Sequence, residues 1–261
     1  MAEAKGQADQ RYANGSVIVT GSSRGIGASI VLALAKRGVP VCIHHGHSAS
    51  DADIVKSQVI AFGGRAHVVQ AELANEHDIV RLFSECEAML GPIRGLVNNA
   101  GYVGRAGRRL KDANAQVIQK TFAINVIAPM LCTREAIKRM GTGVGQTGGR
   151  IINISSISSR LGGANDWVDY AASKAALNTF TLGAARELAG EGIRVNAVSP
   201  GVVETRLHAD AGAADRLERL ASLTPVGRHG QPTEVAQVVE WLLLDAPDYI
   251  TGSNFEIAGG L

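Results

Sequence analysis

The sequence of 261 residues is short of cysteine and of net charge. Its three cysteines, Cys42, Cys86 and Cys132, are widely spaced and form no CxxC pair, which argues against a disulfide framework and against a zinc-binding cluster. Lys and Arg number 26 and Asp and Glu number 24, so the net charge of +2 gives no strong basic field for nucleic acid or an anionic lipid surface. We therefore expect thiols in a reducing compartment, and no nucleic-acid partner.

Long apolar runs are also missing. No stretch approaches the roughly 20 apolar residues that span a bilayer. Residues 1–13 are polar and lack the apolar segment of a secretory signal. We expect a cytoplasmic protein with no membrane segment, in which residues 1–13 form a disordered polar tail.

Strand-like and helix-like patterns alternate along the rest of the chain. Short runs rich in β-branched residues predict strands at residues 16–20, 39–45, 66–71, 95–98, 150–155, 193–198 and 254–257. Helical spacing fills the intervals, at residues 26–37, 50–62, 76–90, up to about 140, 168–189 and from 232 onward. This alternation is typical of parallel strands joined by crossover helices.

Glycine is abundant: 31 glycines make up about 12% of the chain, against a usual level of about 7%. Three of them, Gly21, Gly25 and Gly27, occur in the segment Thr20-Gly-Ser-Ser-Arg-Gly-Ile-Gly27, between the first predicted strand and helix. Backbone N–H groups and the helix dipole at such a turn can bind a pyrophosphate. The alternative is a tight turn with no ligand, and the spacing GxxxGxG differs from the common GxGxxG fingerprint.

The predicted fold is therefore α/β: one doubly wound, Rossmann-like parallel sheet of about seven strands, with helices on both faces. No linker or change of composition divides residues 14–261, so we expect one domain.

A second pattern is Tyr170-Ala-Ala-Ser-Lys174, on a predicted helix. The i, i+4 spacing places the phenol and the ammonium on one face. A phenol has an unperturbed pKa near 10, so it works as an acid or base at neutral pH only when a cation stabilises the phenolate. The alternative is an amphipathic helix with an ordinary surface lysine.

Further motifs follow the later strands in order: Asn98-Asn-Ala-Gly101, Asn125, Asn153-Ile-Ser-Ser156, Pro200-Gly201 and the ending Thr251-Gly-Ser-Asn-Phe-Glu-Ile-Ala-Gly-Gly260. With the two patterns above, the sequence resembles the short-chain dehydrogenase/reductase family from about residue 14 to residue 260.

The resemblance implies four catalytic residues. Tyr170 corresponds to the acid or base that exchanges a proton with the substrate oxygen, and Lys174 to the residue that lowers the pKa of the phenol and binds the nicotinamide ribose. Ser156 corresponds to the serine that orients the carbonyl, and Asn125 to the asparagine that supports a proton-relay water. Ser155 adjoins Ser156, and neighbouring residues at a strand end point to opposite sides, so only one faces the cofactor; the motif favours Ser156.

The resemblance also implies a cofactor site. Its predicted residues are Gly21, Ser23, Arg24, Gly25, Ile26, Gly27, His45, Ser48, Glu72, Leu73, Asn99, Ala100, Gly101, Tyr170, Lys174, Pro200, Gly201, Val203 and Thr205. Asn98 corresponds to a stabiliser of the central sheet. Glu72 stands where the family commonly has Asp, and we expect it beside the adenine.

The second predicted strand ends without a carboxylate, since the next one is Asp51. A dinucleotide site that prefers NAD(H) usually has an acidic residue there to hold the ribose hydroxyls. Arg24 can form a charge-assisted bond to a 2′-phosphate, with help from His45 and Ser48. We expect NADP(H) to be preferred, with NAD(H) possible, and no metal, because His44 and His45 point to opposite sides of a strand.

The expected function is reduction of a ketone or aldehyde, as in the similar β-ketoacyl-carrier-protein reductases. A sugar (glucose) dehydrogenase is the alternative. A non-catalytic dinucleotide-binding regulatory protein is possible on the same fold, but it would be expected to lack the tyrosine, lysine or serine. Residues 202–224, with Arg206, His208, Arg216 and Arg219, are the predicted substrate lid, and residues 162–167 should line the substrate cleft. The resemblance further implies a homotetramer.

Overall fold

The structure is a computed structural model that describes residues 12, 15–141, 148–213 and 216–261. The predicted tail, residues 1–13, therefore lies outside the described residues except for Tyr12. The Tyr12 side chain is buried in the core.

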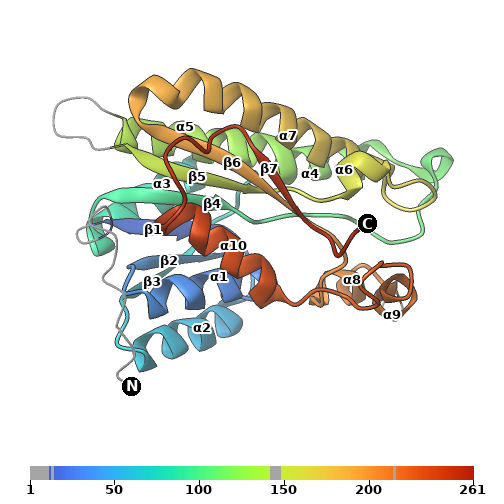
Figure 1. Ribbon diagram of the computed structural model, residues 1–261, viewed down its shortest axis with the longest axis horizontal. Coiled ribbons are helices and arrows are strands. Elements are labelled where there is room, and N and C mark those ends of the chain that lie inside the picture. Colours follow the sequence, from blue (N-terminus) through green and yellow to red (C-terminus); the bar gives the residue numbers. More distant parts are fainter. Residues whose placement is uncertain (1–11, 13–14, 142–147, 214–215) are drawn as a thin grey trace.

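Seven parallel strands form one sheet in the order β3-β2-β1-β4-β5-β6-β7, which confirms the predicted fold class (Figure 1). The strands are β1 (Ser16–Val19), β2 (Val41–His45), β3 (Ala66–Gln70), β4 (Ile93–Asn98), β5 (Gly149–Ile154), β6 (Ile193–Pro200) and β7 (Asn254–Ile257).

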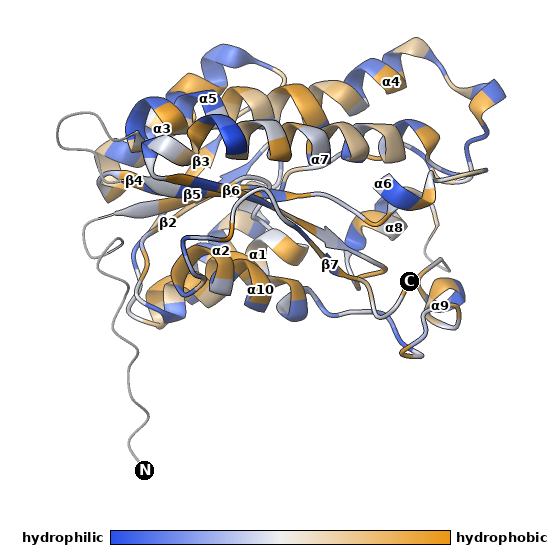
Figure 2. Cartoon of the chain, turned by 45° about the horizontal axis from the view of Figure 1, so that its top comes forward, coloured by the Kyte–Doolittle hydropathy of each residue, from blue (hydrophilic) through white to orange (hydrophobic). Residues whose placement is uncertain are grey.

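Helices cover both faces of the sheet. On one face lie α1 (Gly25–Lys36), α2 (Ala49–Ala61) and α10 (Pro232–Leu244); Figure 2 shows the hydrophobic residues of α1 and α10 beside the strands. On the other face lie α3 (Glu76–Leu90), α4 (Ala115–Phe122), α5 (Ala128–Met140) and α7 (Val168–Leu188). The described residues also form short helices: η2 (Leu110–Asp112), α6 (Ser158–Leu161), η4 (Ala189–Glu191), α8 (Arg206–Asp210) and α9 (Arg216–Ala221).

The alternation of side chains along each strand divides the core into two layers. In β1, Val17 and Val19 pack with the helices α1, α2 and α10, whereas Ile18 packs with α3, α5 and α7. All three are fully buried. Burial of each such side chain contributes about 1.5–3 kcal/mol, so the β-branched strands hold the helices on both faces.

A single helical run spans Ala115–Met140, because α4 continues through a π-helical turn, η3 (Ala123–Ile127), into α5. By length and composition alone, this run is apolar enough to cross a membrane, but the core helix of a soluble protein passes the same test. Here α5 packs against β4 and α3, so part of its apolar surface belongs to the core.

The order of the strands reverses beside β1, because the chain runs outward to β3 and then returns to β4 on the other side. At such a point the loops after adjacent strands diverge and leave a crevice at the carboxyl ends of the strands. The fold therefore places the turn after β1 opposite the loop after β4, where the glycine-rich turn and the Asn98–Gly101 motif occur.

Candidate active site

A cavity of about 770 Å³ opens at the carboxyl ends of the strands. It is lined by the turn after β1, the ends of β2, β4, β5 and β6, the start of α7 and the segment after β6. Every predicted site residue lines it except Gly27 and Asn125. The fold thus gathers into one crevice residues that lie as far apart in the chain as Gly21 and Thr205.

Tyr170, Ser156 and Lys174 lie together in this cavity. Tyr170 is in the first turn of α7, only 8% exposed, and its hydroxyl is hydrogen-bonded to Ser156. The neighbouring Ser155 instead donates its hydroxyl hydrogen to the carbonyl of Lys174, at 3.1 Å. Of the two adjacent serines, Ser156 therefore contacts the phenol, while Ser155 holds the backbone of the helix.

The charges in this group differ from the expected ones. Burial raises the pKa of Tyr170 to about 12, partly offset by the hydrogen bond to Ser156, so the net shift in this structure is opposite to the lowering predicted from Lys174. The reason is geometric: Lys174 Nζ lies 5.7 Å from the centre of the phenol ring and donates to the Ile154 carbonyl at 2.7 Å. Burial also lowers the pKa of Lys174 to about 8. At neutral pH the phenol is protonated and most of the lysine is charged.

Asn125 lies in the π-helical turn and is fully buried. Its side-chain amide donates to the Tyr102 carbonyl at 2.8 Å and to the Ser173 hydroxyl at 3.0 Å, and its carbonyl accepts from the Tyr102 N–H at 2.8 Å. These bonds tie the loop after β4 to α7, next to the predicted catalytic residues. The side chain does not reach the cavity, and its relay role stays a prediction.

The glycines of the turn serve different contacts. Gly21 has φ +61°, and a Cβ there would lie 2.9 Å from the Cα of Ala100, so the two loops of the crevice could not approach. A Cβ on Gly27 would lie 2.5 Å from the amide nitrogen of Asn99. Gly27 thus packs α1 against the loop after β4 and does not line the cavity, where we expected a cofactor contact.

His44 is a further residue of the cavity, and sequence reasoning did not assign it to the site. Its Nδ1 accepts the Gly21 N–H at 2.9 Å, and its Nε2 lies 3.0 Å from the Ala71 carbonyl, so Nε2 carries the proton. Burial lowers the pKa of His44 to about 4 and keeps the ring neutral. The imidazole holds the glycine-rich turn against β2 and β3.

Asn98 supports the sheet beneath the site. Its amide donates to the Asn153 side chain at 2.8 Å, and Asn153 donates to the Thr181 hydroxyl at 2.8 Å. This buried polar chain joins β4, β5 and α7, as the resemblance implied for Asn98.

The turn can hold an anionic dinucleotide. Arg24, the N-cap residue of α1, makes no side-chain capping bond, so the helix presents its first N–H groups and its positive dipole end to the cavity. Among the described residues, the buried Nδ1 of His45 has no hydrogen-bond partner. Arg24 pairs with Asp210 of α8 at 2.9 Å, and both side chains are nearly half exposed. An anion beside Arg24 and His45 would supply the bond that His45 lacks.

The rest of the cavity has several apolar wall residues. The sequence predicted two of the segments that supply them, residues 162–167 and 202–224, but not their apolar character. Trp167 packs edge-on against the Tyr170 ring, with ring centres 6.0 Å apart. The walls include Tyr102, Val103, Leu161, Trp167, Leu220 and Leu223. These residues carry no recognisable motif, because their positions depend on how three separate loops fold.

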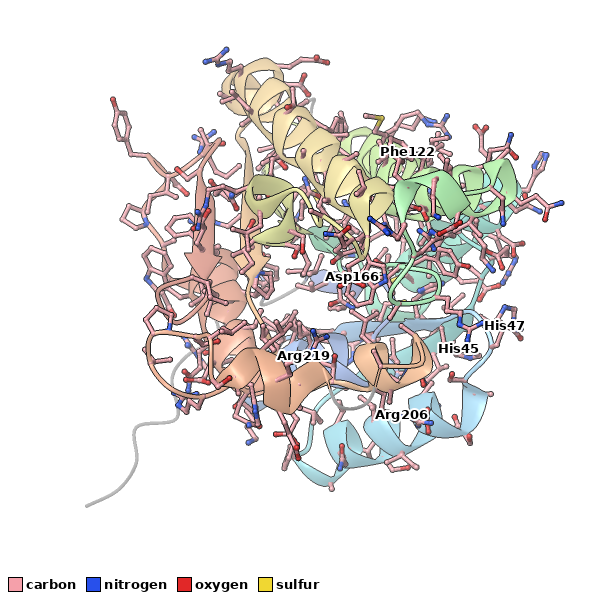
Figure 3. All side chains as sticks on the ribbon, turned by 90° about the vertical axis from the view of Figure 1, so that its right-hand side faces the viewer. His45, His47, Phe122, Asp166, Arg206 and Arg219 are labelled. Atoms are coloured by element: carbon pink, nitrogen blue, oxygen red, sulfur yellow. The ribbon has the colours of Figure 1, made fainter. Side chains whose placement is uncertain are left out.

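The two predicted substrate segments contribute unequally. Of residues 162–167, Trp167 lines the cavity. From the lid, Arg206 lines it and Arg219 does not, while the side chains of His208 and Arg216 lie outside the described residues. Figure 3 shows Arg206 and Arg219 on the lid and His45 and His47 at the end of β2. Within the described ranges, no group of three or more His, Cys, Asp or Glu side chains could hold a metal ion.

Comparisons with known proteins agree over nearly the whole chain. A family model described as enoyl-(acyl carrier protein) reductase matches residues 21–261. The uncharacterized oxidoreductase YgfF of Escherichia coli is 42% identical over 93% of this chain and 98% of its own. A 3-oxoacyl-(acyl-carrier-protein) reductase of Synechocystis is 37% identical over 94% of this chain and 95% of its own. A short chain dehydrogenase of Burkholderia cenocepacia, solved in complex with NADP, is 33% identical with a TM-score of 0.85, covering 96% of this chain and 99% of that one.

Proposed function

The chain belongs to the short-chain dehydrogenase/reductase family, and from this premise we propose that it is an NADP(H)-dependent oxidoreductase acting on a carbonyl or secondary-alcohol substrate, with Tyr170 as the acid or base. One observation carries the proposal: a buried, protonated phenol is hydrogen-bonded to Ser156 beside the Lys174 ammonium, in the wall of the cavity.

The nicotinamide, when bound, supplies or accepts the hydride. In the direction of reduction, Ser156 donates a hydrogen bond to the substrate oxygen, and Tyr170 gives it a proton as negative charge develops there. Both interactions are stronger in the transition state than with the neutral carbonyl, so they accelerate the reaction. An alkoxide is a much stronger base than a phenolate, so the transfer is downhill even from a phenol whose pKa is about 12.

Lys174 has two proposed tasks. Its ammonium, buried in the same pocket, stabilises the phenolate that remains after the proton has left Tyr170. By family resemblance it also binds the nicotinamide ribose. Both tasks require the charged form, and burial makes that form less stable than in an exposed lysine.

Several features support NADP(H) over NAD(H). No carboxylate lies at the end of β2, and Asp51 is directed toward Arg206, at 3.9 Å. Arg24 and His45 both line the cavity and provide a cation and an unpaired ring nitrogen. The Burkholderia cenocepacia neighbour was solved in complex with NADP. We place the 2′-phosphate between Arg24, His45 and Ser48, and the adenine beside Glu72 and Leu73.

The apolar walls favour one substrate class. Trp167, Leu161, Leu220 and Leu223 suit a carbonyl compound with a hydrocarbon portion, whereas a sugar would leave its hydroxyls against apolar side chains. The similarity to the Synechocystis 3-oxoacyl reductase points the same way. We therefore prefer a β-ketoacyl-type substrate to a sugar.

We also propose a cytoplasmic homotetramer. The three cysteines are free and buried, which suits a reducing compartment. Ile127, Met130 and Leu182 expose large apolar side chains on the helices beside the site, and contact between chains would cover them. Light scattering tests the proposed tetramer. One chain has a mass of 27.2 kDa, and a tetramer would have four times that mass.

Replacement of the phenol by a benzene ring tests the function. A Tyr170→Phe variant cannot donate the proton, so we expect NADPH oxidation with β-ketoesters to fall by about 10²–10⁴-fold, while NADPH binding, followed by fluorescence, stays nearly unchanged. Tyr249→Phe is the matched control, because Tyr249 is 99% exposed and lies outside the cavity.

Full activity of the Tyr170→Phe variant would show that another group is the acid. Aldoses, diketones and quinones, tested in the same assay, separate the substrate classes. NADPH binding by the wild type with no turnover of any of them would favour the regulatory protein.

A further inference from the structure

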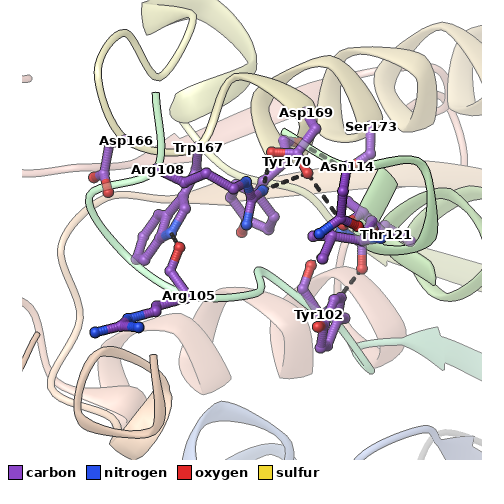
Figure 4. Close-up of polar contacts among 12 residues, drawn as sticks. Tyr102, Arg105, Arg108, Asn114, Thr121, Asp166, Trp167, Asp169, Tyr170 and Ser173 are labelled. Carbon is purple, nitrogen blue, oxygen red and sulfur yellow. Dashed lines mark hydrogen bonds and ion pairs between the residues drawn. The ribbon is translucent and has the colours of Figure 1, made fainter. Parts of the chain in front are cut away.

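Residues 105 to 108 of the loop between β4 and α4 are each bonded to another segment, three of them to residues 166–169 and residue 106 to the end of α8. Figure 4 shows Arg105 and Arg108 beside Trp167 and Asp169. The Arg105 carbonyl accepts from the indole N–H of Trp167 at 3.3 Å. The Gly107 N–H donates to the Asp166 carboxylate at 3.0 Å. Both partners lie in the segment that leads into α7, directly before Tyr170.

Arg108 makes the strongest of these contacts. Its Nη2 lies 2.5 Å from both carboxylate oxygens of Asp169, and the two side chains are only 11% and 9% exposed. The Thr121 hydroxyl of α4 lies 3.5 Å from the same carboxylate. Burial of two charges carries a large desolvation penalty, so a buried ion pair often adds little to stability. A gain in stability therefore does not by itself explain why Arg108 and Asp169 are paired here.

Residue 106 is held from the other side. The Ala106 N–H donates to the carbonyl of Ala211, at the end of α8, at 2.8 Å. Ala106 also packs against a small buried cluster that contains Trp167 and Tyr170. Residues 105–108 are thus fixed between the lid and the start of α7.

These contacts reach the first turn of α7 and the two residues before it. The N-cap residue of α7, Trp167, makes no side-chain capping bond. Asp169 is directly followed by Tyr170, and Trp167 packs edge-on against the Tyr170 ring. Contacts to residues 105–108 therefore fix both the backbone beside the phenol and the ring that packs on it.

We propose that residues 105–108 form a clasp that positions Tyr170 for proton transfer, with Arg108 and Asp169 as its positioning residues. The proposal rests on the proposed function, since it assigns these two residues to the orientation of the same proton donor. The clasp acts through the backbone and through Trp167, because Arg108 and Asp169 do not line the cavity. A displacement of about 1 Å at the donor can lower a rate by about 10²-fold.

The test compares three variants with the wild type. Arg108→Met leaves a buried carboxylate unpaired and could fail to fold, so the decisive variant is Arg108→Met/Asp169→Asn, which removes both charges. The charge-reversed pair, Arg108→Asp/Asp169→Arg, restores the ion pair in the opposite sense. Arg109→Met is the control, because Arg109 is the adjacent arginine and is exposed.

For the double variant we expect kcat to fall at least tenfold, with the dissociation constant of NADPH within twofold of the wild type and an equal melting temperature. The charge-reversed pair should recover part of the lost kcat, and Arg109→Met should keep the wild-type value. A purely structural pair would lower the melting temperature and NADPH affinity together with kcat, and that result overturns the proposal. An unchanged kcat in the double variant also overturns the proposed role of residues 105–108. If Tyr170→Phe is inactive in the same assay, the proposed function of the protein still holds.

Discussion

Tyr170 and Lys174 are both shielded from solvent, and burial moves their pKa values in opposite directions from their ordinary ranges. The spacing of the two residues predicted that they share a helix face, which the structure has. The spacing could not predict the direction in which the pKa of Tyr170 shifts. That direction depends on the Ile154 carbonyl, which accepts a hydrogen bond from the Lys174 ammonium, and on the residues that exclude water from the phenol. Sequence spacing defines neighbours on one helix, whereas desolvation depends on the whole fold.

The lysine gives a pH dependence whose sign follows from its pKa of about 8. Reduction needs the ammonium, so kcat/KM should fall about tenfold per pH unit above 8, measured from pH 6 to 10. Because the folded pKa lies below the unfolded value of 10.5, the unfolded chain binds more protons between pH 8 and 10.5. Lys174 therefore makes the free energy of unfolding rise with pH between pH 8 and 10.5. Deprotonation of Lys174 does not unfold the protein in this range, so unfolding does not explain the expected fall in kcat/KM. A flat kcat/KM up to pH 10 would show that the charge of Lys174 is not needed.

A substitution of Arg24 tests the proposed preference for NADP(H). Arg24→Ala should raise the dissociation constant of NADPH by about 10-fold or more and leave that of NADH within about twofold, because only NADPH carries the 2′-phosphate. Asp210→Ala is the matched control: it frees Arg24 from its ion pair and should not weaken NADPH binding. Equal losses for both cofactors in Arg24→Ala would contradict the placement of the phosphate.

The elements were predicted well from the sequence. The first strand was expected at residues 16–20 and spans Ser16–Val19; the last helix was expected from residue 232 and is Pro232–Leu244. Periodicity and turn residues carry this information locally. The π-helical turn at Ala123–Ile127 and the short helices α6, α8 and α9 carry no such signal. The clasp joins residues about 60 positions apart, and no local pattern reveals such a contact.

Gly27 gives a prediction about the packing of α1. In Gly27→Ala the new Cβ would meet the Asn99 amide at 2.5 Å and the Gly21 carbonyl at 2.6 Å, so the helix and the turn must move apart. We expect a loss of about 1–3 kcal/mol in the free energy of unfolding, measured by urea denaturation, together with weaker cofactor binding. Ser29→Ala in the same helix adds no atom and should stay within about 0.5 kcal/mol of the wild type. Wild-type stability of Gly27→Ala would contradict the close approach.

At the scale of the whole molecule, the reversal of strand order beside β1 determines where chemistry can occur. It brings the glycine-rich turn, the loop after β4, Ser156 and the start of α7 into one cavity, although they are spread over 150 residues of sequence. The sequence predicted that the glycine-rich turn and several of the later motifs follow strands, and the structure has them there. The apolar walls were not predictable, because they depend on which side chains of the lid segment, such as Leu220 and Leu223, line the cavity.

The central claim is that a nicotinamide dinucleotide lies along this edge, with its reactive ring beside Tyr170. A crystal structure of the chain with NADP⁺ tests this without knowledge of the substrate. We predict the pyrophosphate at the N-terminus of α1, the 2′-phosphate against Arg24, and the nicotinamide within reach of the Tyr170 and Ser156 hydroxyls. A dinucleotide bound elsewhere, or bound here with its nicotinamide directed away from Tyr170, would contradict the account.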